Sequence, residues 1–182
     1  MRIQPERSFV AIDERIRQTE NPRHRAMLEN YRAHLAAEVA GDLDAIMATM
    51  SDEPAYHTWS PGGEMNGGPK NRAQTVEFYR SIFDNGYNKL ERVTEKLVVN
   101  DDYIVNEGWL HTIYPGRTLA RMGLDVRPER YYLHSNRVVA ILPYVGEGTD
   151  VRMDGEDVYT LPGRPTEESI VELNDAEVEG IV

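Results

Sequence analysis

The sequence contains no cysteine in its 182 residues. Disulfide bonds, thiolate nucleophiles and cysteine-based zinc sites are therefore excluded, and a reducing compartment suits the chain. Long apolar runs are also lacking, since no stretch approaches the roughly 20 apolar residues of a membrane span. The first residues carry mixed charge and do not form the apolar core of a signal peptide. We therefore expect an unprocessed cytoplasmic protein without membrane contact.

Positive charge is scarce as well. The 20 Lys and Arg residues face 31 Asp and Glu residues, which gives a formal net charge of -11. Nucleic acids and anionic lipid surfaces are bound through clustered basic residues, so neither is an expected partner. Part of the negative charge is concentrated in residues 164–182, where we expect a solvated tail or a terminal helix.

The length favours one domain around one core. Hydrophobic residues make up 40% of the chain and charged residues 28%, which is ordinary for a folded protein. We divide the chain into a helical extension at residues 1–20, a main domain at 21–162 and an acidic tail at 163–182.

Helix signals fill the first part of the chain. Ser8 is placed to cap a short helix that ends near Arg17, and Asn21 before Pro22 is typical of the start of a second, longer helix. That helix should end at Gly41, and its apolar stripe consists of Leu28, Tyr31, Leu35 and Val39. Asp42 should cap a further helix over residues 43–50.

Strand signals dominate the rest. A short strand at residues 54–60 precedes a turn at Pro61-Gly62-Gly63, and Gly67-Gly68-Pro69 opens a helix with Val76, Tyr79 and Phe83 on one face. Four further strands, expected to be antiparallel, cover residues 89–99, 103–114, 130–144 and 151–160. The connection at 115–129 is long for a hairpin and typical of a lid. Because most helices precede most strands along the chain, the sequence predicts an α+β fold. In this fold a curved, mostly antiparallel sheet wraps around the helices and encloses a pocket.

Four segments carry a resemblance to a known family by their order along the chain. They are Gly41-Asp42-Leu43-Asp44, Tyr56-His57-Thr58-Trp59-Ser60-Pro61 with the following Gly67-Gly68, Val76-Glu77-Phe78-Tyr79, and Gly155-Glu156-Asp157-Val158-Tyr159. Over residues 22–160 the chain resembles the NTF2-like superfamily, in particular its SnoaL-like branch of polyketide cyclases, isomerases and dehydratases. The resemblance implies a cone with an apolar pocket, a homodimer through the outer sheet face, and catalysis without metal or organic cofactor. One departure is that Thr160 follows Tyr159, where many members carry an acid.

The leading catalytic candidates lie on the strand at 103–114. The two-residue period of a strand places Glu107, Trp109 and His111 on one face, which we expect to line the pocket. Burial would raise the pKa of the carboxyl while the imidazole titrates near neutrality, a pairing suited to general acid–base catalysis. The competing interpretation is a solvent-exposed face with a surface ion pair.

Further catalytic candidates come from other elements. His57 shares a strand face with Trp59 and is the second candidate base, although a lone histidine is more often part of hydrogen-bonded structure. Tyr31 could polarise a substrate carbonyl, although core packing is the commoner fate of such a residue. Glu156 and Asp157 alternate faces on the last strand, so only one of them can be an inward-facing base.

Substrate-binding candidates are aromatic or polar residues at expected cavity positions. They are Trp59, Trp109, His34, Tyr79, His134, Tyr144 and, from the long connection, Arg121. Structural hydrogen bonding or solvated surface charge is the competing interpretation for several of them. A metal site is not expected, because the five histidines are dispersed and no His-Glu-x-x-His run occurs.

Three kinds of function remain open from the sequence, the last of them a purely structural dimer whose cavity is filled by side chains. The first is a cofactor-independent acid–base enzyme, a lyase or isomerase that dehydrates, isomerises, cyclises or cleaves a small apolar substrate of aromatic or polycyclic type. The second is a non-catalytic module that binds a small molecule or mediates dimerisation. An open cavity with an ionisable side chain in its wall would favour the enzyme, and a filled core would favour a structural role.

Overall fold

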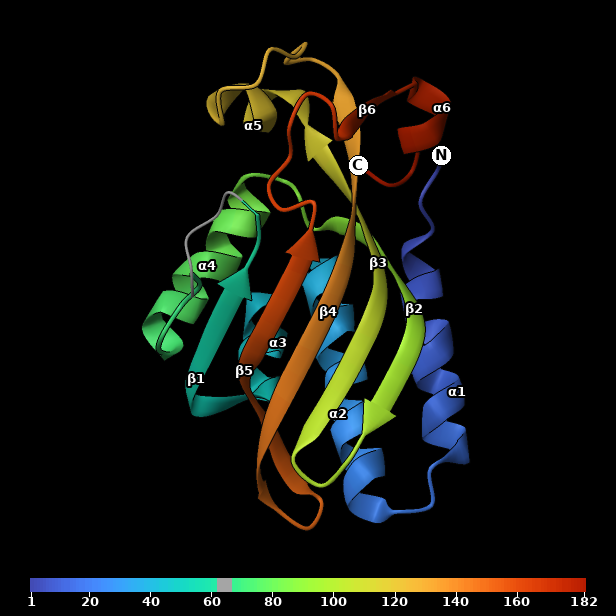
Figure 1. Cartoon of the computed structure of the whole chain (residues 1–182), viewed down its shortest axis with the longest axis vertical. Coiled ribbons are helices and arrows are strands. Elements are labelled where there is room, and N and C mark those ends of the chain that lie inside the picture. The colour runs from blue at the N-terminus through green and yellow to red at the C-terminus, as the bar shows by residue number, and fades with distance from the viewer. Residues whose placement is uncertain (62–66) are drawn as a thin grey trace.

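A curved sheet packed against helices organises the chain (Figure 1), which a computed structural model describes over residues 1–61 and 67–182. The turn predicted at Gly62 and Gly63 lies outside these residues. Helical elements are η1 (Pro5–Phe9), α1 (Val10–Gln18), α2 (Pro22–Ala40), α3 (Leu43–Thr49), α4 (Arg72–Asp84), α5 (Gly116–Arg121) and α6 (Asp175–Val178). Strands are β1 (Met50–Trp59), β2 (Lys89–Val99), β3 (Tyr103–Pro115), β4 (Tyr131–Glu147), β5 (Asp150–Leu161) and β6 (Ile170–Leu173).

Local capping sets most of the helix ends as predicted. The Asn21 side chain accepts hydrogen bonds from the first backbone amides of α2, and Gly41 ends that helix in the left-handed conformation at φ 76°. Asp42 caps α3. The prediction for Ser8 is wrong, because α1 begins at Val10 and the buried Ser8 hydroxyl accepts a hydrogen bond from the backbone N–H of Arg92 at 2.9 Å.

The sheet has the order β1-β5-β4-β3-β2, with β6 added beside β4. The pairs β2–β3, β3–β4 and β4–β5 are antiparallel, which confirms the prediction for the four long strands. β1 instead runs parallel to β5, with Tyr56 opposite Glu156 and His57 opposite Asp157. This pairing brings the two strands that carry most of the polar candidates to neighbouring positions.

Helices α2 and α3 lie behind the sheet in Figure 1, and α4 lies beside β1. The main core includes Met27 and Leu28 of α2, Ile46 of α3 and Met153 of β5, all of which are inaccessible to solvent. Burial of such side chains contributes about 1.5–3 kcal/mol each, so this layer holds the helices on the concave face of the sheet. Within the described ranges, no helix combines the length and the apolar character that crossing a bilayer demands.

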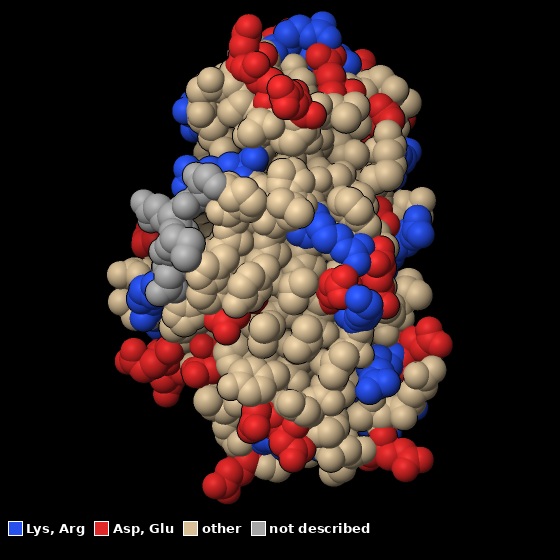
Figure 2. Space-filling view, in the orientation of Figure 1, with Lys and Arg blue, Asp and Glu red and all other residues tan. Residues whose placement is uncertain are grey.

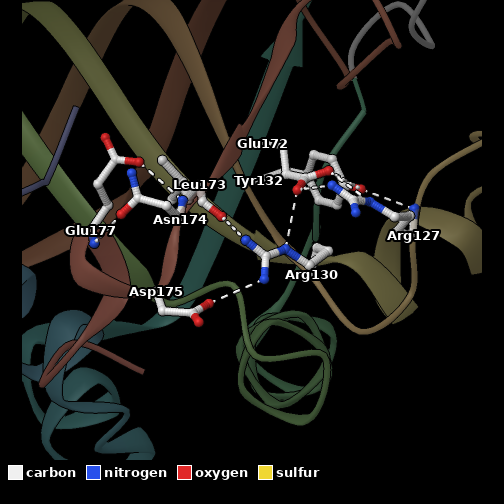
Figure 3. A network of polar contacts seen from close by, with 8 residues as sticks. All are labelled: Arg127, Arg130, Tyr132, Glu172, Leu173, Asn174, Asp175 and Glu177. Atoms are coloured by element: carbon white, nitrogen blue, oxygen red, sulfur yellow. Dashed lines mark hydrogen bonds and ion pairs between the residues drawn. The ribbon is translucent and has the colours of Figure 1, made fainter.

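The acidic C-terminal segment is more structured than a solvated tail. β6 pairs with β4, and Leu173 and Val178 pack with Ile3 in a second apolar cluster. Arg130 binds this segment from the start of β4, because it pairs with Glu172 and Asp175 and donates a hydrogen bond to the Leu173 carbonyl at 2.9 Å (Figure 3). The segment therefore closes one end of the molecule, next to α5 (Figure 1).

Candidate functional site

A cavity of about 550 Å³ lies between the concave face of the sheet and helices α2 and α4. Its walls include the apolar side chains Phe78, Ile82 and Leu110 and the carboxyls Glu38 and Glu156. A smaller inner pocket of about 100 Å³ shares these two carboxyls. The volume suits a small organic molecule, and Glu38 and Glu156 stand where the two spaces meet.

A strand irregularity turns Glu156 into the cavity. Upstream in β5 the odd-numbered Val151 and Met153 are buried in the core, whereas downstream the even-numbered Glu156 and Val158 line the cavity. The register between β4 and β5 shifts in this region, and Gly155 has φ 121° with no room for a Cβ, which would lie 1.8 Å from the Ala55 carbonyl oxygen. One extra residue in a strand exchanges its two faces.

The two cavity carboxyls hold their protons unusually strongly. Burial raises the pKa of Glu156 to about 8, and the nearby Glu38 carboxyl adds to the rise. Burial also raises the pKa of Glu38 to about 7. The Arg92 guanidinium opposes both shifts, since a nearby positive charge favours ionised carboxylates. Near neutral pH the pair therefore holds protons and can release them, which is the condition for acid–base chemistry.

A chain of hydrogen bonds runs from α3 to the cavity beside Glu156. Thr49 Oγ1 lies 2.8 Å from His34 Nδ1, His34 Nε2 lies 2.9 Å from the Tyr79 hydroxyl, and the Tyr79 and Tyr56 hydroxyls are 2.8 Å apart. Tyr56 also forms a hydrogen bond with the Glu156 carboxyl, and its hydroxyl lowers the pKa of Glu156 against the larger rise from burial by donating to the ionised form. Burial lowers the pKa of His34 to about 3, so the imidazole is neutral near pH 7. Burial raises the pKa of Tyr56 and Tyr79 well above the usual value, so both stay protonated.

The face of β3 that was expected to line the cavity points outward instead. Glu107 pairs with Lys96 at 2.7 Å and with Arg137 at 2.6 Å, and these partners lower its pKa. Trp109 is 38% exposed beneath the Arg137 guanidinium, and His111 contacts Ser135 at 2.7 Å. The expectation that these three residues face the cavity is therefore wrong, and the alternative of a surface ion pair holds for Glu107.

His57 and Trp59 also lie on the outer face. His57 Nδ1 contacts Asp157 Oδ1 at 2.7 Å, and Trp59 stacks on Tyr159 at 4.8 Å between ring centroids. Neither side chain lines the main cavity, whereas their neighbours Tyr56 and Thr58 do. The expected inward orientation of His57 and Trp59 is wrong. Successive residues of a strand point to opposite faces, so Asp157 points outward where Glu156 points inward. His57, which lies opposite Asp157 on β1, points outward with it.

The remaining candidates divide between the cavity and the structural core. Tyr31 and His34 line the inner pocket, and Tyr79 lines the main cavity. Tyr144 is buried and donates a hydrogen bond to the Met27 carbonyl at 3.0 Å, which is a structural role. His134 is buried but does not line the main cavity.

Arg121 does not line the cavity either. It is exposed and donates a hydrogen bond to Asn85 Oδ1 at 2.8 Å. Its neighbour Met122, also in the connection at 115–129, does line the cavity. The connection therefore contributes Met122 to the cavity wall and does not contribute Arg121, and its role as a lid stays a prediction.

Three functional positions were missed from the sequence: Glu38, Tyr56 and Arg92. The helical period contained a signal for Glu38, because it lies seven residues after Tyr31 and thus on the same face of α2. An acid at a position of an apolar stripe is unusual for a core helix. Arg92 is 6% exposed and its Nε has no hydrogen-bond partner among the described residues, a burial that strand alternation alone does not reveal.

Metal coordination finds no support in the described part of the chain, where no group of three or more His, Asp or Glu side chains could hold an ion. The polar side chains that line the two spaces are two carboxyls, the guanidiniums of Arg92 and Arg164, the His34 imidazole, the Asn136 amide, and phenol and aliphatic hydroxyls. This set suits proton transfer and binding of polar groups on an organic molecule.

Comparison with known proteins gives a fold. No family model matches the chain, and no curated protein does. A putative SnoaL-like polyketide cyclase from Shewanella putrefaciens CN-32 superimposes with a TM-score of 0.62 at 11% identity, over 87% of this chain and 88% of that chain. An NTF2-like protein from Anabaena variabilis ATCC 29413 has a TM-score of 0.54 at 12% identity, over 81% and 96%.

An enzyme is also among the similar structures. The epoxide hydrolase/cyclase-like enzyme SalBIII, described in pyran ring formation in the polyether salinomycin, has a TM-score of 0.52 at 14% identity, over 89% of this chain and 99% of that chain. The chain therefore has the NTF2-like cone fold, and SnoaL-like proteins are among its structural neighbours, which confirms the predicted resemblance. At these identities the likeness establishes the fold and leaves the reaction to be argued from the site.

Proposed function

We propose that this NTF2-like protein is a cofactor-independent acid–base enzyme in which Glu156 and Glu38 move a proton on a small organic molecule bound in the cavity. The observation that carries the proposal is the position of two carboxyls with raised pKa values, about 8 and about 7, at the inner end of one apolar cavity. Two such groups do not stabilise a structural core, because burying a carboxyl without a charged partner costs free energy. A function explains why they are present.

The two carboxyls suit complementary roles. Near pH 7 Glu156 is mainly protonated and can donate its proton to a substrate oxygen, while Glu38 in its ionised form can accept a proton from a C–H or O–H group. One proton is given and one is taken, so the pair returns to its starting state by exchanging a proton. The Arg92 guanidinium faces both groups and stabilises the negative charge that the transfer leaves.

The cavity wall favours a neutral, largely apolar substrate with oxygen-bearing groups. Phe78, Ile82 and Leu110 supply apolar contacts, and Thr112 and Asn136 add polar groups on the sheet side. Asn136 is 8% exposed, and its Oδ1 has no hydrogen-bond partner within residues 1–61 and 67–182. Buried polar atoms rarely stay unpaired, so a ligand hydroxyl or amide is the expected partner. Isomerisation, dehydration, cyclisation and cleavage all fit this pair of carboxyls.

The test starts from the ligand that the cavity retains. A Glu156→Gln variant should hold substrate without turning it over, so the small molecules that co-purify with it are identified by mass spectrometry. Incubation of these molecules with wild-type protein in D₂O should give a new isomer or fragment, or deuterium incorporation. Recovery of every retained molecule unchanged would contradict the enzyme and leave a binding module.

We also infer a homodimer through the outer sheet face. Figure 2 shows the central part of this face as largely uncharged, with a group of acidic and basic residues to the right of centre and further charged residues toward the rim. Tyr159 and Leu161 are 45% and 62% exposed there, close to Trp59. An extended apolar surface of this kind is typical of an interface. Light scattering should give twice the monomer mass for wild type and the monomer mass for Leu161→Glu, and a wild-type monomer would contradict this inference.

A further inference from the structure

The hydrogen-bonded chain that ends at Glu156 has a direction, and its anchored end sets it. Thr49 Oγ1 lies 2.6 Å from the Ile46 carbonyl oxygen, which can only accept, so the single hydroxyl hydrogen of Thr49 points there. Toward His34 the Thr49 oxygen is therefore an acceptor, and the His34 nitrogen at 2.8 Å, Nδ1, must carry the hydrogen. Because the ring is neutral, Nε2 has no hydrogen and accepts from the Tyr79 hydroxyl at 2.9 Å.

The direction of the hydrogen bonds is fixed in the same way from Tyr79 to the cavity. Tyr79 has given its only hydrogen to His34, so the contact of 2.8 Å between the two hydroxyls requires Tyr56 to donate to Tyr79. The Tyr56 oxygen then presents lone pairs to Glu156. A protonated Glu156 completes the chain by donating to that oxygen, whereas an ionised Glu156 would face lone pairs with lone pairs. This direction of the chain therefore favours the acid form of Glu156.

Loss of the Glu156 proton favours the opposite direction. A carboxylate is a stronger acceptor than a phenol oxygen and draws the Tyr56 hydrogen to itself. Tyr79 must then donate to Tyr56, and His34 must donate to Tyr79 from Nε2. One hydrogen is now on Nε2 instead of Nδ1, the ring stays neutral, and the Thr49 hydroxyl turns from the Ile46 carbonyl to Nδ1. Each protonation state of Glu156 is thus matched by a different tautomer of His34.

We propose that His34 is a positioning residue for the Glu156 proton, whose Nδ1–H tautomer holds Glu156 in the acid form and whose Nε2–H tautomer accompanies the ionised form. The inference rests on the proposed function, in that Glu156 is the group that gives and takes the proton. His34 touches no substrate in this role, since its hydrogen bonds reach Glu156 through Tyr79 and Tyr56, and its Nε2 lies 3.6 Å from Glu156 Oε1 itself.

Other ionisable groups also face Glu156 and must be separated from His34 in any test. They are Glu38 and Tyr31 from α2, Arg92 from β2, Tyr56 from β1, Tyr79 from α4 and Tyr144 from β4. Of these only Glu38 is expected to titrate in the same pH range as Glu156, since its pKa is raised to about 7. A Glu38→Gln variant is therefore the control for this group.

The test is ¹⁵N NMR of the histidines in the full-length protein, which distinguishes the two neutral tautomers by their ring-nitrogen shifts. Between about pH 6 and about pH 9.5 we expect His34 to change from the Nδ1–H to the Nε2–H tautomer, without ring protonation. The change should persist in Glu38→Gln and disappear in Glu156→Gln, where the Nδ1–H form should remain throughout. One unchanging tautomer in the wild type, or a change that persists in Glu156→Gln, would overturn the proposal.

A matched pair of variants at Thr49 separates positioning from mere packing. Thr49→Val leaves the Nδ1–H donor without its acceptor. The Nε2–H tautomer loses less, because the Thr49 hydroxyl can reach Nδ1 only by giving up the Ile46 carbonyl. The midpoint of the Glu156 titration, followed by ¹³C NMR of the carboxyl, should therefore fall by about one pH unit. Thr49→Ser keeps the hydroxyl and should restore the wild-type midpoint. Equal midpoints in wild type and Thr49→Val would overturn the proposal. Both measurements need no substrate, so loss of turnover in Glu156→Gln with an unresponsive His34 would refute this inference alone.

Discussion

Glu156 Oε1 lies 3.6 Å from His34 Nε2, and the two groups are both neutral near pH 7. The distance alone would suit an ion pair. Burial raises the pKa of Glu156 to about 8 and lowers that of His34 to about 3, so moving the proton from the acid to the imidazole is unfavourable in this environment. The proton therefore stays on Glu156, and the two side chains do not form a salt bridge. Glu156 is then available as a proton donor near neutral pH.

Removal of the Glu156 proton donor should stop turnover while the fold persists. Glu156→Gln keeps the shape of the side chain, and loss of a general acid typically costs about 10²–10⁴-fold in rate. Asp157→Asn is the matched control, because Asp157 is the next residue in β5 but lies on the outer face beside His57. Turnover of the retained ligand is measured for both, and equal rates for Glu156→Gln and wild type would remove Glu156 from the mechanism.

Stability should fall as the pH rises through the range in which the cavity carboxyls ionise. The pKa of Glu156 is higher in the folded chain, about 8, than the ordinary value of 4.5, so between these values the folded state binds more protons than the unfolded state. Its stabilising contribution is complete below about pH 4.5 and is lost as the pH passes about 8. Denaturant titrations should show a decline that is shallower in Glu156→Gln, by up to about 1.4 kcal/mol per pH unit. Parallel curves would contradict the raised pKa.

The bulge at Gly155 should tolerate no side chain. A Cβ there would lie 1.8 Å from the Ala55 carbonyl oxygen at φ 121°, so Gly155→Ala should destabilise the fold by about 2 kcal/mol or more. Gly148→Ala serves as the control, because Gly148 also has a positive φ, 57°, but meets nothing within 4 Å. Denaturant unfolding measures both variants. Similar losses for the two would show that the close approach of β5 to β1 does not matter.

The C-terminal segment should detach when Arg130 is removed. Arg130 joins Glu172, Leu173 and Asp175 to the start of β4, whereas the Arg127 side chain is more exposed and, within the C-terminal segment, pairs with Glu172 (Figure 3). Hydrogen exchange of the β6 amides should rise by about ten-fold or more in Arg130→Ala and less in Arg127→Ala. Unchanged protection in Arg130→Ala would show that apolar packing of Leu173 suffices.

Local signals in the sequence predicted the elements well. Asn21, Gly41 and Asp42 carry their capping chemistry in their own side chains or backbone freedom, so helix ends could be read without tertiary information. β-branched and aromatic runs between turn residues located the long strands for the same reason. The C-terminal strand β6 was missed, because its pairing with β4 depends on contacts far apart in the sequence.

The orientation of strand faces could not be predicted in the same way. On β3 the inner face has Asn106 and Gly108, while the outer face has Glu107 and Trp109, so both faces mix polar and apolar character. Because a tryptophan is usually buried, Trp109 favoured the prediction that its face lines the cavity, but this side chain is exposed. On β5 the single-residue shift near Gly155 exchanges the faces within one strand, and simple alternation contains no sign of it.

A cavity carboxyl that holds its proton near neutral pH is the basis of the proposed site, and ¹³C NMR of the Glu side-chain carboxyls tests for it most directly. The resonance that disappears in Glu156→Gln identifies Glu156. We predict that this carboxyl titrates with a midpoint about 8. A midpoint near 4.5, the usual value for a glutamate, would mean that Glu156 is an ordinary carboxylate, and the proposed acid–base site would be contradicted.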